Sequence, residues 1–195
     1  MYQMIVKRLL DIAISVMALL FLLILFVILG PIIYFTDKGP IFYCAPRVGK
    51  NGKIFNMFKF RSMYVNVPDI RNEDGSTYNS EKDPRVTPIG RIIRQTSLDE
   101  IPQFLNTLFG TMSVIGPRPD LPTAIDKYTE TERRKLKVRP GITGYNQAYF
   151  RNSVTWKECL EHDVYYVENL SFLFDVKIFI KTLESVIMQK GIHRN

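Results

Sequence analysis

The chain has 195 residues, of which 46% are hydrophobic and 23% are charged, and its formal net charge is +7. This size allows one globular domain with an appendage, and the composition excludes both an intrinsically disordered chain and a bundle made only of membrane helices. The positive charge indicates an anionic partner, such as nucleic acid, acidic lipid or a phosphorylated small molecule, and does not choose among them.

An uncharged apolar run extends from Ile12 to Phe35. As a helix this run would be about 36 Å long, whereas the hydrocarbon core of a bilayer is about 30 Å thick. The run is therefore predicted to enter a membrane. A signal peptide is the alternative, but the run is long for such a segment and no small-residue cleavage site follows it.

Basic residues flank the apolar run on both sides. Those before it are Lys7 and Arg8, and those after it are Lys38, Arg47, Lys50, Lys53, Lys59 and Arg61. Because positive flanks favour the cytoplasmic side, both ends are expected there, which predicts a re-entrant helix broken at Gly30-Pro31. A spanning helix kinked near its end is the alternative. Asp11 is interpreted as an interfacial ion-pair partner of the basic pair.

A β-hairpin is predicted next, with strands at 41–43 and 54–60 around a turn at 50–53. Lys59 and Arg61 are two residues apart, so they are expected to project from the same face. The polar stretch 66–87 is predicted to be a surface loop.

A short helix is predicted over 89–94, followed by a second helix that ends at Gly110. Apolar residues of the second helix fall on one face, at Ile101, Phe104, Leu105 and Leu108. Pro102 lacks an N–H, so it belongs near the start of this helix. Asp99 and Glu100 are thus expected at the helix N-terminus.

Two interpretations of this acidic pair are open. Asp99 can be an ordinary N-cap with Glu100 in the first turn. Alternatively, the pair can bind Mg²⁺, or one carboxylate can attack phosphorus, inside a phosphate site. The second interpretation is favoured by cations that could share the site, namely Lys59, Arg61, Arg94 and Arg118 of the Gly116–Pro119 turn.

Cysteine and histidine usage agrees with an oxygen-bound metal. Cys44 and Cys159 are far apart and the chain has two histidines, so neither a disulfide framework nor a zinc site is expected. Farther along the chain, residues 133–139 are predicted to form a basic helix facing solvent or lipid headgroups. Residues 139–147 are predicted to contain a rigid turn, and 171–188 a helix that lies either in the core or at the membrane interface.

Six motifs in this order resemble the bacterial sugar transferases that start glycan assembly on polyprenyl phosphate. The motifs are K-F-R-S-M, D-P-R-x-T, R-x-T-S-L-D-E-x-P-Q-x-x-N, M-S-x-x-G-P-R-P, R-P-G-I-T-G and D-x-x-Y. More narrowly, the chain resembles the small monotopic phosphoglycosyl transferases, and the resemblance runs from about Lys7 to Met188.

The resemblance implies a specific reaction. A UDP-sugar would give its phosphosugar to undecaprenyl phosphate and release UMP, with Mg²⁺ required. Asp99 would be the nucleophile that forms a covalent phosphosugar intermediate, and Glu100 would assist at the metal or in proton transfer. Residues matching further substrate-binding positions are Lys59, Arg61, Arg94, Arg118, Arg151, Asp163 and Tyr166.

The chain departs from the family pattern at several positions. The usual proline near the middle of the membrane helix is absent, which leaves the depth of insertion open. Other positions carry Ala45, Thr111 and Tyr145 in place of the usual residues, and Arg151 lies in an altered stretch that bears on the fit of sugar or nucleotide. None of these departures touches the Asp99–Glu100 pair.

These observations together predict an α+β protein with two parts. Residues 1–38 would form the re-entrant membrane helix, and residues 39–195 a mostly helical catalytic domain with a short β-hairpin and amphipathic interfacial helices, at the cytoplasmic face of the bacterial inner membrane. No nucleic-acid partner is expected. The alternatives are the same reaction through a ternary complex, and a non-enzymatic, membrane-tethered basic module that binds anionic lipid or nucleic acid. The sugar, the pathway and the oligomeric state are left open.

Overall fold

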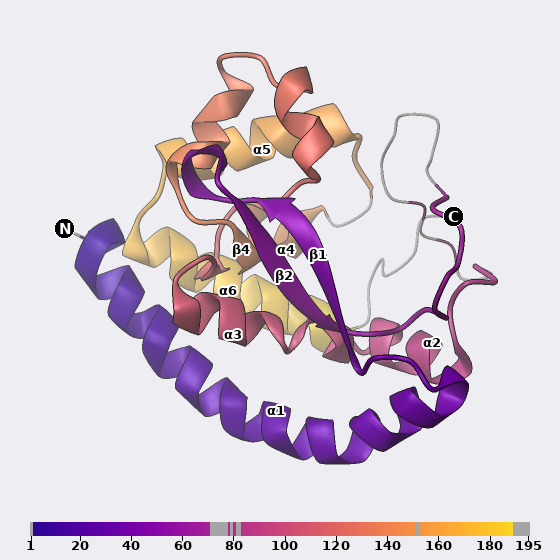
Figure 1. Ribbon diagram of the computed structural model, residues 1–195. Helices are drawn as coiled ribbons and strands as arrows, with labels where there is room; N and C mark the ends of the chain where they lie inside the picture. Colours follow the sequence, from indigo (N-terminus) through magenta and orange to yellow (C-terminus); the bar gives the residue numbers. More distant parts are fainter. Residues whose placement is uncertain (1, 71–77, 79, 81–82, 151–152, 189–195) are drawn as a thin grey trace.

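The protein combines one long N-terminal helix with a mixed body of helices and short strands (Figure 1). A computed structural model describes residues 2–70, 78, 80, 83–150 and 153–188. The helices are α1 (Lys7–Asp37), α2 (Pro88–Gln95), α3 (Gln103–Phe109), α4 (Tyr145–Tyr149), α5 (Trp156–Glu168) and α6 (Phe172–Ile187). The strands are β1 (Phe42–Val48), β2 (Ile54–Phe60), β3 (Ser113–Ile115) and β4 (Gly141–Thr143). Short helical turns occupy Tyr2–Val6, Lys50–Gly52, Leu98–Glu100, Pro122–Lys127 and Glu132–Lys137.

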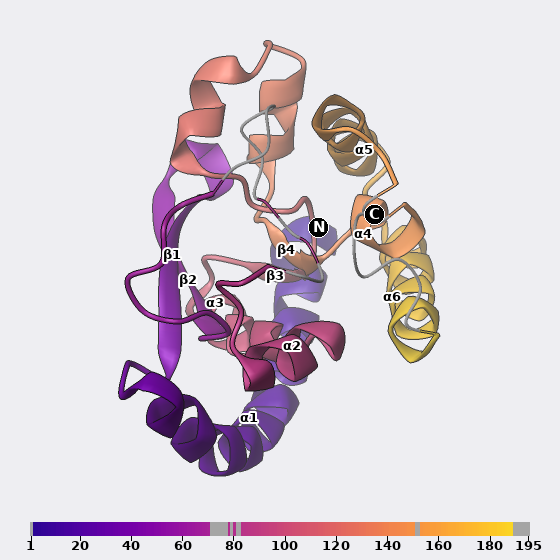
Figure 2. The same cartoon turned by 90° about the vertical axis from the view of Figure 1, so that its right-hand side faces the viewer.

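Helix α1 is long and apolar enough to cross a membrane by length and composition. It is continuous through Pro31, so the interruption predicted at Gly30-Pro31 is not seen. Instead, the helix curves along its length with its concave side toward the rest of the molecule (Figures 1 and 2). A helix that wraps around a core commonly bends in this direction.

One stripe of α1 is buried against the body, and the other faces are exposed and apolar. The buried apolar residues follow a helical spacing and share a core cluster with β2 and α2: Leu22, Leu25, Leu29, Ile33, Phe60 and Ile93. Leu98 and Ile101, on either side of the acidic pair, pack against this cluster. The helix therefore carries both a protein-facing stripe and a surface suited to lipid.

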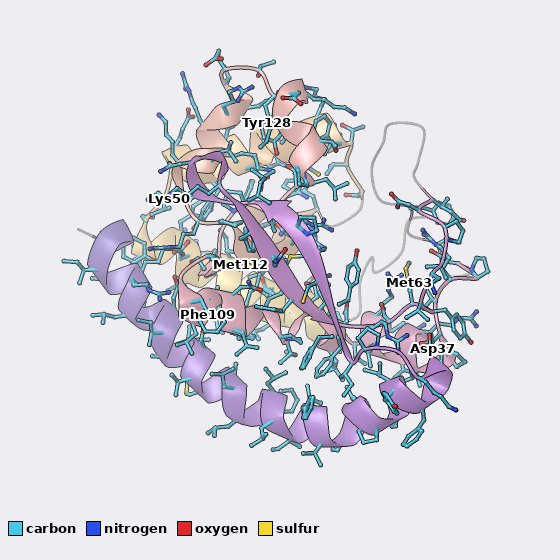
Figure 3. The ribbon with its side chains drawn as sticks, viewed as in Figure 1. Asp37, Lys50, Met63, Phe109, Met112 and Tyr128 are labelled. Atoms are coloured by element: carbon cyan, nitrogen blue, oxygen red, sulfur yellow. The ribbon has the colours of Figure 1, made fainter. Side chains whose placement is uncertain are left out.

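The predicted hairpin is confirmed, and its first strand is longer than expected. β1 and β2 pair antiparallel from Phe42 opposite Phe60 to Val48 opposite Ile54. The turn uses Asn51 at φ 56° and Gly52 at φ 76°, the left-handed conformation that these two residue types tolerate best. Figure 3 places Lys50, in this turn, far from Asp37 at the end of α1.

The second sheet of the described residues is a short parallel pair, β3 with β4, in register from Ser113 opposite Gly141 to Ile115 opposite Thr143. It lies within a second core cluster, formed with α4, α5 and α6, that includes Val114, Tyr166 and Ile178. The Gly116–Pro119 turn, which contains Arg118, directly follows the end of β3, so this sheet positions that turn.

Two sequence-based expectations are wrong in this region. The basic stretch 133–139 is not a solvated α-helix: most of it lies in the Glu132–Lys137 turn, where Lys135 is buried. Asp11 is not an interfacial ion-pair partner, because it is buried and accepts hydrogen bonds from Ser113 Oγ (3.0 Å) and Val114 N (2.9 Å) of β3. In both cases a charged side chain is buried and binds other residues inside the protein. The periodicity of the sequence alone does not indicate such contacts.

Candidate active site

The acidic pair lies in a tight turn between α2 and α3. Ser97 adopts φ 58°, a left-handed conformation that is costly for a residue with a side chain, and Leu98–Glu100 then form a single 3-10 turn. Helix α3 begins later, with Pro102 as its N-cap and no side-chain cap. The interpretation of Asp99 as an ordinary N-cap is therefore wrong, and its carboxylate is available for another role.

Cations surround the pair from two elements. Lys59 of β2 places Nζ 2.6 Å from Glu100 Oε1 and 3.6 Å from Asp99 Oδ2. Arg118, in the turn after β3, places Nη2 3.3 Å from the same Glu100 oxygen. The side chain of Asp99 is 10% exposed, that of Glu100 21% and that of Arg118 54%. The site therefore opens to solvent on the side of Arg118, with Asp99 at its base.

The two carboxylates have different electrostatic environments. Burial raises the pKa of Asp99, an effect that Lys59 partly offsets and that the neighbouring Glu100 charge increases. Burial also opposes ionisation of Glu100, but Lys59 and Arg118 outweigh it and lower the pKa of Glu100 to about 2. No donor among the described residues hydrogen-bonds to Asp99, whereas Glu100 is held by two cations. Asp99 is thus the less tightly held carboxylate of the pair, with Lys59 Nζ at 3.6 Å rather than the 2.6 Å found at Glu100.

Arg94 of α2 lies near the acidic pair. Residues from two of the sequence motifs, K-F-R-S-M and D-P-R-x-T, hold this arginine and its helix in position. Its Nε donates to Ser62 Oγ at 2.9 Å. Thr87 caps the helix by accepting from Gly90 N at 2.9 Å, and a Cβ on Gly90 would lie 1.9 Å from Ser62 O. Burial lowers the pKa of Arg94, and the negative charge of Asp99 has the largest opposing effect on that pKa. The close packing of α2 on Ser62 therefore sets the position of this arginine.

Asn106, to which no sequence pattern assigns a role, joins α3 to β2. Its Oδ1 accepts from Phe58 N at 2.9 Å and its Nδ2 donates to Asn56 O at 2.7 Å, so the amide takes the place of a neighbouring strand. This holds the strand that carries Lys59 against the helix that follows the acidic pair. An asparagine inside a short helix is itself a signal, because it disfavours helix interiors unless it has a specific partner.

A buried ion network supports the Arg118 turn from behind. Lys135 is 4% exposed and places Nζ 2.7 Å from Asp120 Oδ2 and 2.6 Å from Asp163 Oδ2. The same ammonium donates to Arg118 O at 3.3 Å. Burial raises the pKa of Asp163 to about 6, although Lys135 acts to lower it. Asp163, expected to bind substrate, thus contacts Lys135, which in turn binds the backbone of Arg118.

Three further residues were expected in the site. The expectation that Arg61 joins Lys59 on one face is wrong, because its guanidinium binds the end of α1, with Asp37 Oδ2 at 2.6 Å and Ile33 O at 3.0 Å. Arg61 follows the last residue of β2, where strand alternation no longer applies. Tyr166 is buried and donates to Asp175 Oδ1 at 2.8 Å, so it contributes to the core. Arg151 lies outside the described residues.

The carboxylate oxygens of the site suit a magnesium ion that is also bound by a substrate. They suit less well a metal ion bound by protein side chains alone. Within the described part of the chain, no group of three or more acidic, histidine or cysteine side chains is placed to hold a metal. The carboxylate oxygens of Asp99 accept no hydrogen bond from the described residues, and Glu100 adds a second carboxylate beside it. Mg²⁺ commonly uses one or two protein carboxylates together with substrate phosphates and water, and this site offers two carboxylates.

The chain matches the profile of the family described as "Bacterial sugar transferase" over residues 2–189. Galactosyl transferase CpsE of Streptococcus agalactiae is 41% identical over 197 residues, covering 97% of this chain and 44% of that protein. The uncharacterized sugar transferase EpsL of Bacillus subtilis is 38% identical, covering 98% of this chain and 92% of that protein.

A relative with a more specific name is the undecaprenyl-phosphate galactose phosphotransferase of Salmonella typhimurium, 36% identical over 202 residues, which cover 95% of this chain and 41% of that protein. The chain thus spans less than half the length of CpsE and of this phosphotransferase, and most of the length of EpsL. The matched regions contain the acidic pair and the elements around it. The chain belongs to the bacterial sugar transferase family.

Proposed function

We propose that the protein transfers a phosphosugar from a UDP-sugar to undecaprenyl phosphate, releasing UMP, as the first membrane step of glycan assembly. The observation that carries the proposal is the environment of Asp99: a nearly buried carboxylate beside Lys59 and near Arg94 and Arg118, with no hydrogen-bond donor among the described residues. The acceptor is suggested by the phosphotransferase relative and by the lipid-suited surface of α1.

The proposed reaction has two displacements at one phosphorus atom. First, an Asp99 oxygen bonds to the sugar-bearing phosphorus and the bond from that phosphorus to the UMP oxygen breaks, so UMP leaves with the electron pair. Second, an oxygen of undecaprenyl phosphate bonds to the same phosphorus and Asp99 is released. The product is undecaprenyl-diphosphate-sugar, and a covalent phosphosugar on Asp99 is the intermediate.

The cations have separate roles in this proposal. Lys59 favours the ionised form of both carboxylates, because it acts to lower the pKa of Asp99 and of Glu100. Arg118 and Arg94 bind phosphate oxygens and stabilise the charge that accumulates on them. Asp99 and Glu100 would hold Mg²⁺ together with the diphosphate, and the ion would neutralise charge on the transferring group.

We further propose a monotopic placement at the cytoplasmic face of the inner membrane. In support, both ends of α1 are bound to the same body: Lys7 Nζ lies 2.6 Å from Asp175 Oδ2, and Arg61 binds Asp37 at the other end. A helix of 31 residues would be about 46 Å long if straight, yet crossing the bilayer would separate one end from its partners. A helix that dips into one leaflet keeps both contacts.

A ternary-complex reaction is the second candidate, in which undecaprenyl phosphate attacks the UDP-sugar directly and the acids only bind metal. The pairing of Glu100 with Lys59 and Arg118 is compatible with either route. The two candidates differ in whether UMP appears before the acceptor is added. A stoichiometric burst of UMP without acceptor supports the covalent route, and no burst supports the ternary complex.

The test of the proposed function is UMP release by purified protein in nanodiscs with Mg²⁺, undecaprenyl phosphate and a panel of UDP-sugars. We expect release with at least one UDP-sugar, its loss in Asp99→Asn, and its retention in Asp126→Asn, an exposed acid far along the chain. Chelation should abolish release and added Mg²⁺ should restore it. No release with any UDP-sugar, or full activity in Asp99→Asn, would contradict the proposal.

A further inference from the structure

The first turns of α1 contain three charged residues, and each contacts a different part of the catalytic body. Lys7 binds Asp175 of α6, Arg8 binds the end of α3, and Asp11 binds β3. Lys7 and Asp11 are buried. These contacts differ from the lipid-headgroup role that basic residues beside a membrane helix usually have. Two of the three contacted elements, α3 and β3, are also those that adjoin the active site.

Arg8 holds the α3 side of the site. Its Nη1 donates to Thr107 O at 2.6 Å and its Nη2 to Leu108 O at 2.8 Å. These are carbonyls of the last turn of α3, at its negative end, and Thr107 O also accepts a hydrogen bond from Gly110 N at 3.0 Å. Helix α3 directly follows the Asp99–Glu100 turn, and its Asn106 holds the strand of Lys59.

Asp11 holds the β3 side of the site. On one edge, β3 is paired with the segment around β4: Ser113 N donates to Pro140 O, and Gly116 N to Thr143 O. Val114 N points to the opposite edge, where Asp11 Oδ1 accepts it at 2.9 Å and also accepts Ser113 Oγ at 3.0 Å. The carboxylate thus occupies the place of a third strand. The next residues are the Gly116–Pro119 turn with Arg118.

The two sides meet where Arg118 Nη2 approaches Glu100 Oε1 at 3.3 Å. We propose that Arg8 and Asp11 are positioning residues that set the location of Arg118 relative to the Asp99–Glu100 pair, so that docking of the membrane helix assembles the active site. The catalytic consequence rests on the proposed function; the positioning of Arg118 by Asp11 does not. The role is distinct from membrane anchoring because these residues contact protein.

The direct test is hydrogen exchange of the full chain in nanodiscs, which needs no substrate. In Asp11→Ala, peptides covering 113–119 should exchange at least about tenfold faster, because the Val114 amide loses its acceptor. Peptides from α5 should be unchanged. Asp11→Asn keeps an acceptor oxygen and should restore most of the protection. The matched control is Ser15→Ala, one turn along the same buried stripe, whose hydroxyl has no hydrogen-bond partner among the described residues.

Kinetics then separate positioning from a general loss of structure. Asp11→Ala should lower kcat for UMP release by roughly 10- to 100-fold, as expected for a displaced charged group, and Ser15→Ala should not. In an Arg118→Ala background, Asp11→Ala should add little, because both changes remove the same contribution. Arg8→Ala should show the same non-additivity with Arg118→Ala. Fully multiplicative losses would overturn the role in positioning.

Other outcomes are distinguishable. Unchanged exchange over 113–119 in Asp11→Ala would overturn the inference whatever the activity, whereas absence of UMP release by the unaltered protein would overturn the proposed function and leave the exchange test intact. If Asp11→Ala does not fold, Ser113→Ala removes only the hydroxyl hydrogen bond and should raise exchange over the same peptides by a smaller factor. No rise in that variant would count against the inference.

Discussion

At the scale of single residues, the site depends on two adjacent acids with different partners. Glu100 binds Lys59 and Arg118 and is ionised throughout the physiological range. Asp99 is more buried than an ordinary surface acid and has a raised pKa. A desolvated carboxylate with one distant cation is a stronger nucleophile than one held by two closer cations, as Glu100 is by Lys59 and Arg118. In the proposed reaction, Glu100 would therefore engage the nearest cations and leave Asp99 to attack the substrate phosphorus.

The first prediction concerns Lys59 and pH. Among the charges around Asp99, Lys59 has the largest lowering effect on its pKa, so Lys59→Met should raise that pKa further. Because the reactive form is the carboxylate, activity is lost as pH falls through the pKa, and the acidic limb of the kcat/KM profile should move to higher pH. Lys59→Arg should keep the limb near its original position.

The control for this prediction is Lys157→Met, which removes a lysine paired with Glu132 away from the site. Its pH profile should match that of the unaltered protein. A limb that stays in place in Lys59→Met, or moves to lower pH, would contradict the assigned role of Lys59.

At the scale of elements, the sequence predicts much of the backbone and little of the charged contacts. The hairpin, α2 and the end of α3 at Gly110 follow from local turn and helix signals, and the structure has them. The sequence does not predict the positions of Arg61 and Lys135, because the residues that neutralise them are distant in sequence: Asp37 for Arg61, and Asp120 and Asp163 for Lys135. Local patterns identify a charged residue and do not identify its long-range partner.

The second prediction concerns Lys135, which supports the Arg118 turn. Lys135→Met leaves Asp120 and Asp163 without their shared cation, and breaking a buried ion pair costs about 3–5 kcal/mol. We expect a loss of this size in the free energy of unfolding near neutral pH. The loss should shrink near about pH 5, because Asp163, whose pKa is about 6 even beside Lys135, can then be protonated.

Chemical denaturation in detergent at the two pH values measures both effects. Lys137→Met, an exposed lysine in the same turn, is the matched control and should change stability little. Equal losses for the two variants, or a larger loss for Lys135→Met at the lower pH, would contradict the proposed network.

The third prediction concerns the packing of α2. In Gly90→Ala the new methyl group would lie 1.9 Å from Ser62 O, which is backbone, so α2 must move away and take Arg94 with it. A displacement of about 1 Å can lower a rate by about 100-fold, and we expect UMP release to fall by at least about tenfold. Gln95→Ala, an exposed change in the same helix, should leave the rate unchanged. A fully active Gly90→Ala variant would show that the position of Arg94 is not critical.

At the scale of the whole molecule, the membrane helix and the body form one packed unit. Helix α1 contributes Leu22, Leu25, Leu29 and Ile33 to a core cluster, and it is joined to the body by ion pairs at both ends. Figure 3 shows Lys50 and Tyr128 on the side of the body away from the arc of α1. This arrangement would hold the acidic pair near the bilayer surface, where a lipid-bound phosphate and a water-soluble sugar donor can both reach it.

The fourth prediction follows from this arrangement. Cysteines introduced at Gln3 and Lys50, in a chain whose Cys44 and Cys159 are replaced by serine and alanine, should react with a membrane-impermeant thiol reagent from the same side of sealed inner-membrane vesicles. The reason is that both ends of α1 are bound to one body, which cannot lie on both sides. Reaction from opposite sides would refute the re-entrant placement and favour a spanning helix.

The most direct test of the central claim is the mass of the intact protein after mixing with a UDP-sugar and Mg²⁺ in the absence of undecaprenyl phosphate. We expect a gain equal to one phosphosugar, mapped by peptide fragmentation to Asp99, absent from Asp99→Asn, and lost when undecaprenyl phosphate is added. An adduct on another residue, or steady turnover with acceptor but no adduct without it, would contradict a covalent intermediate on Asp99.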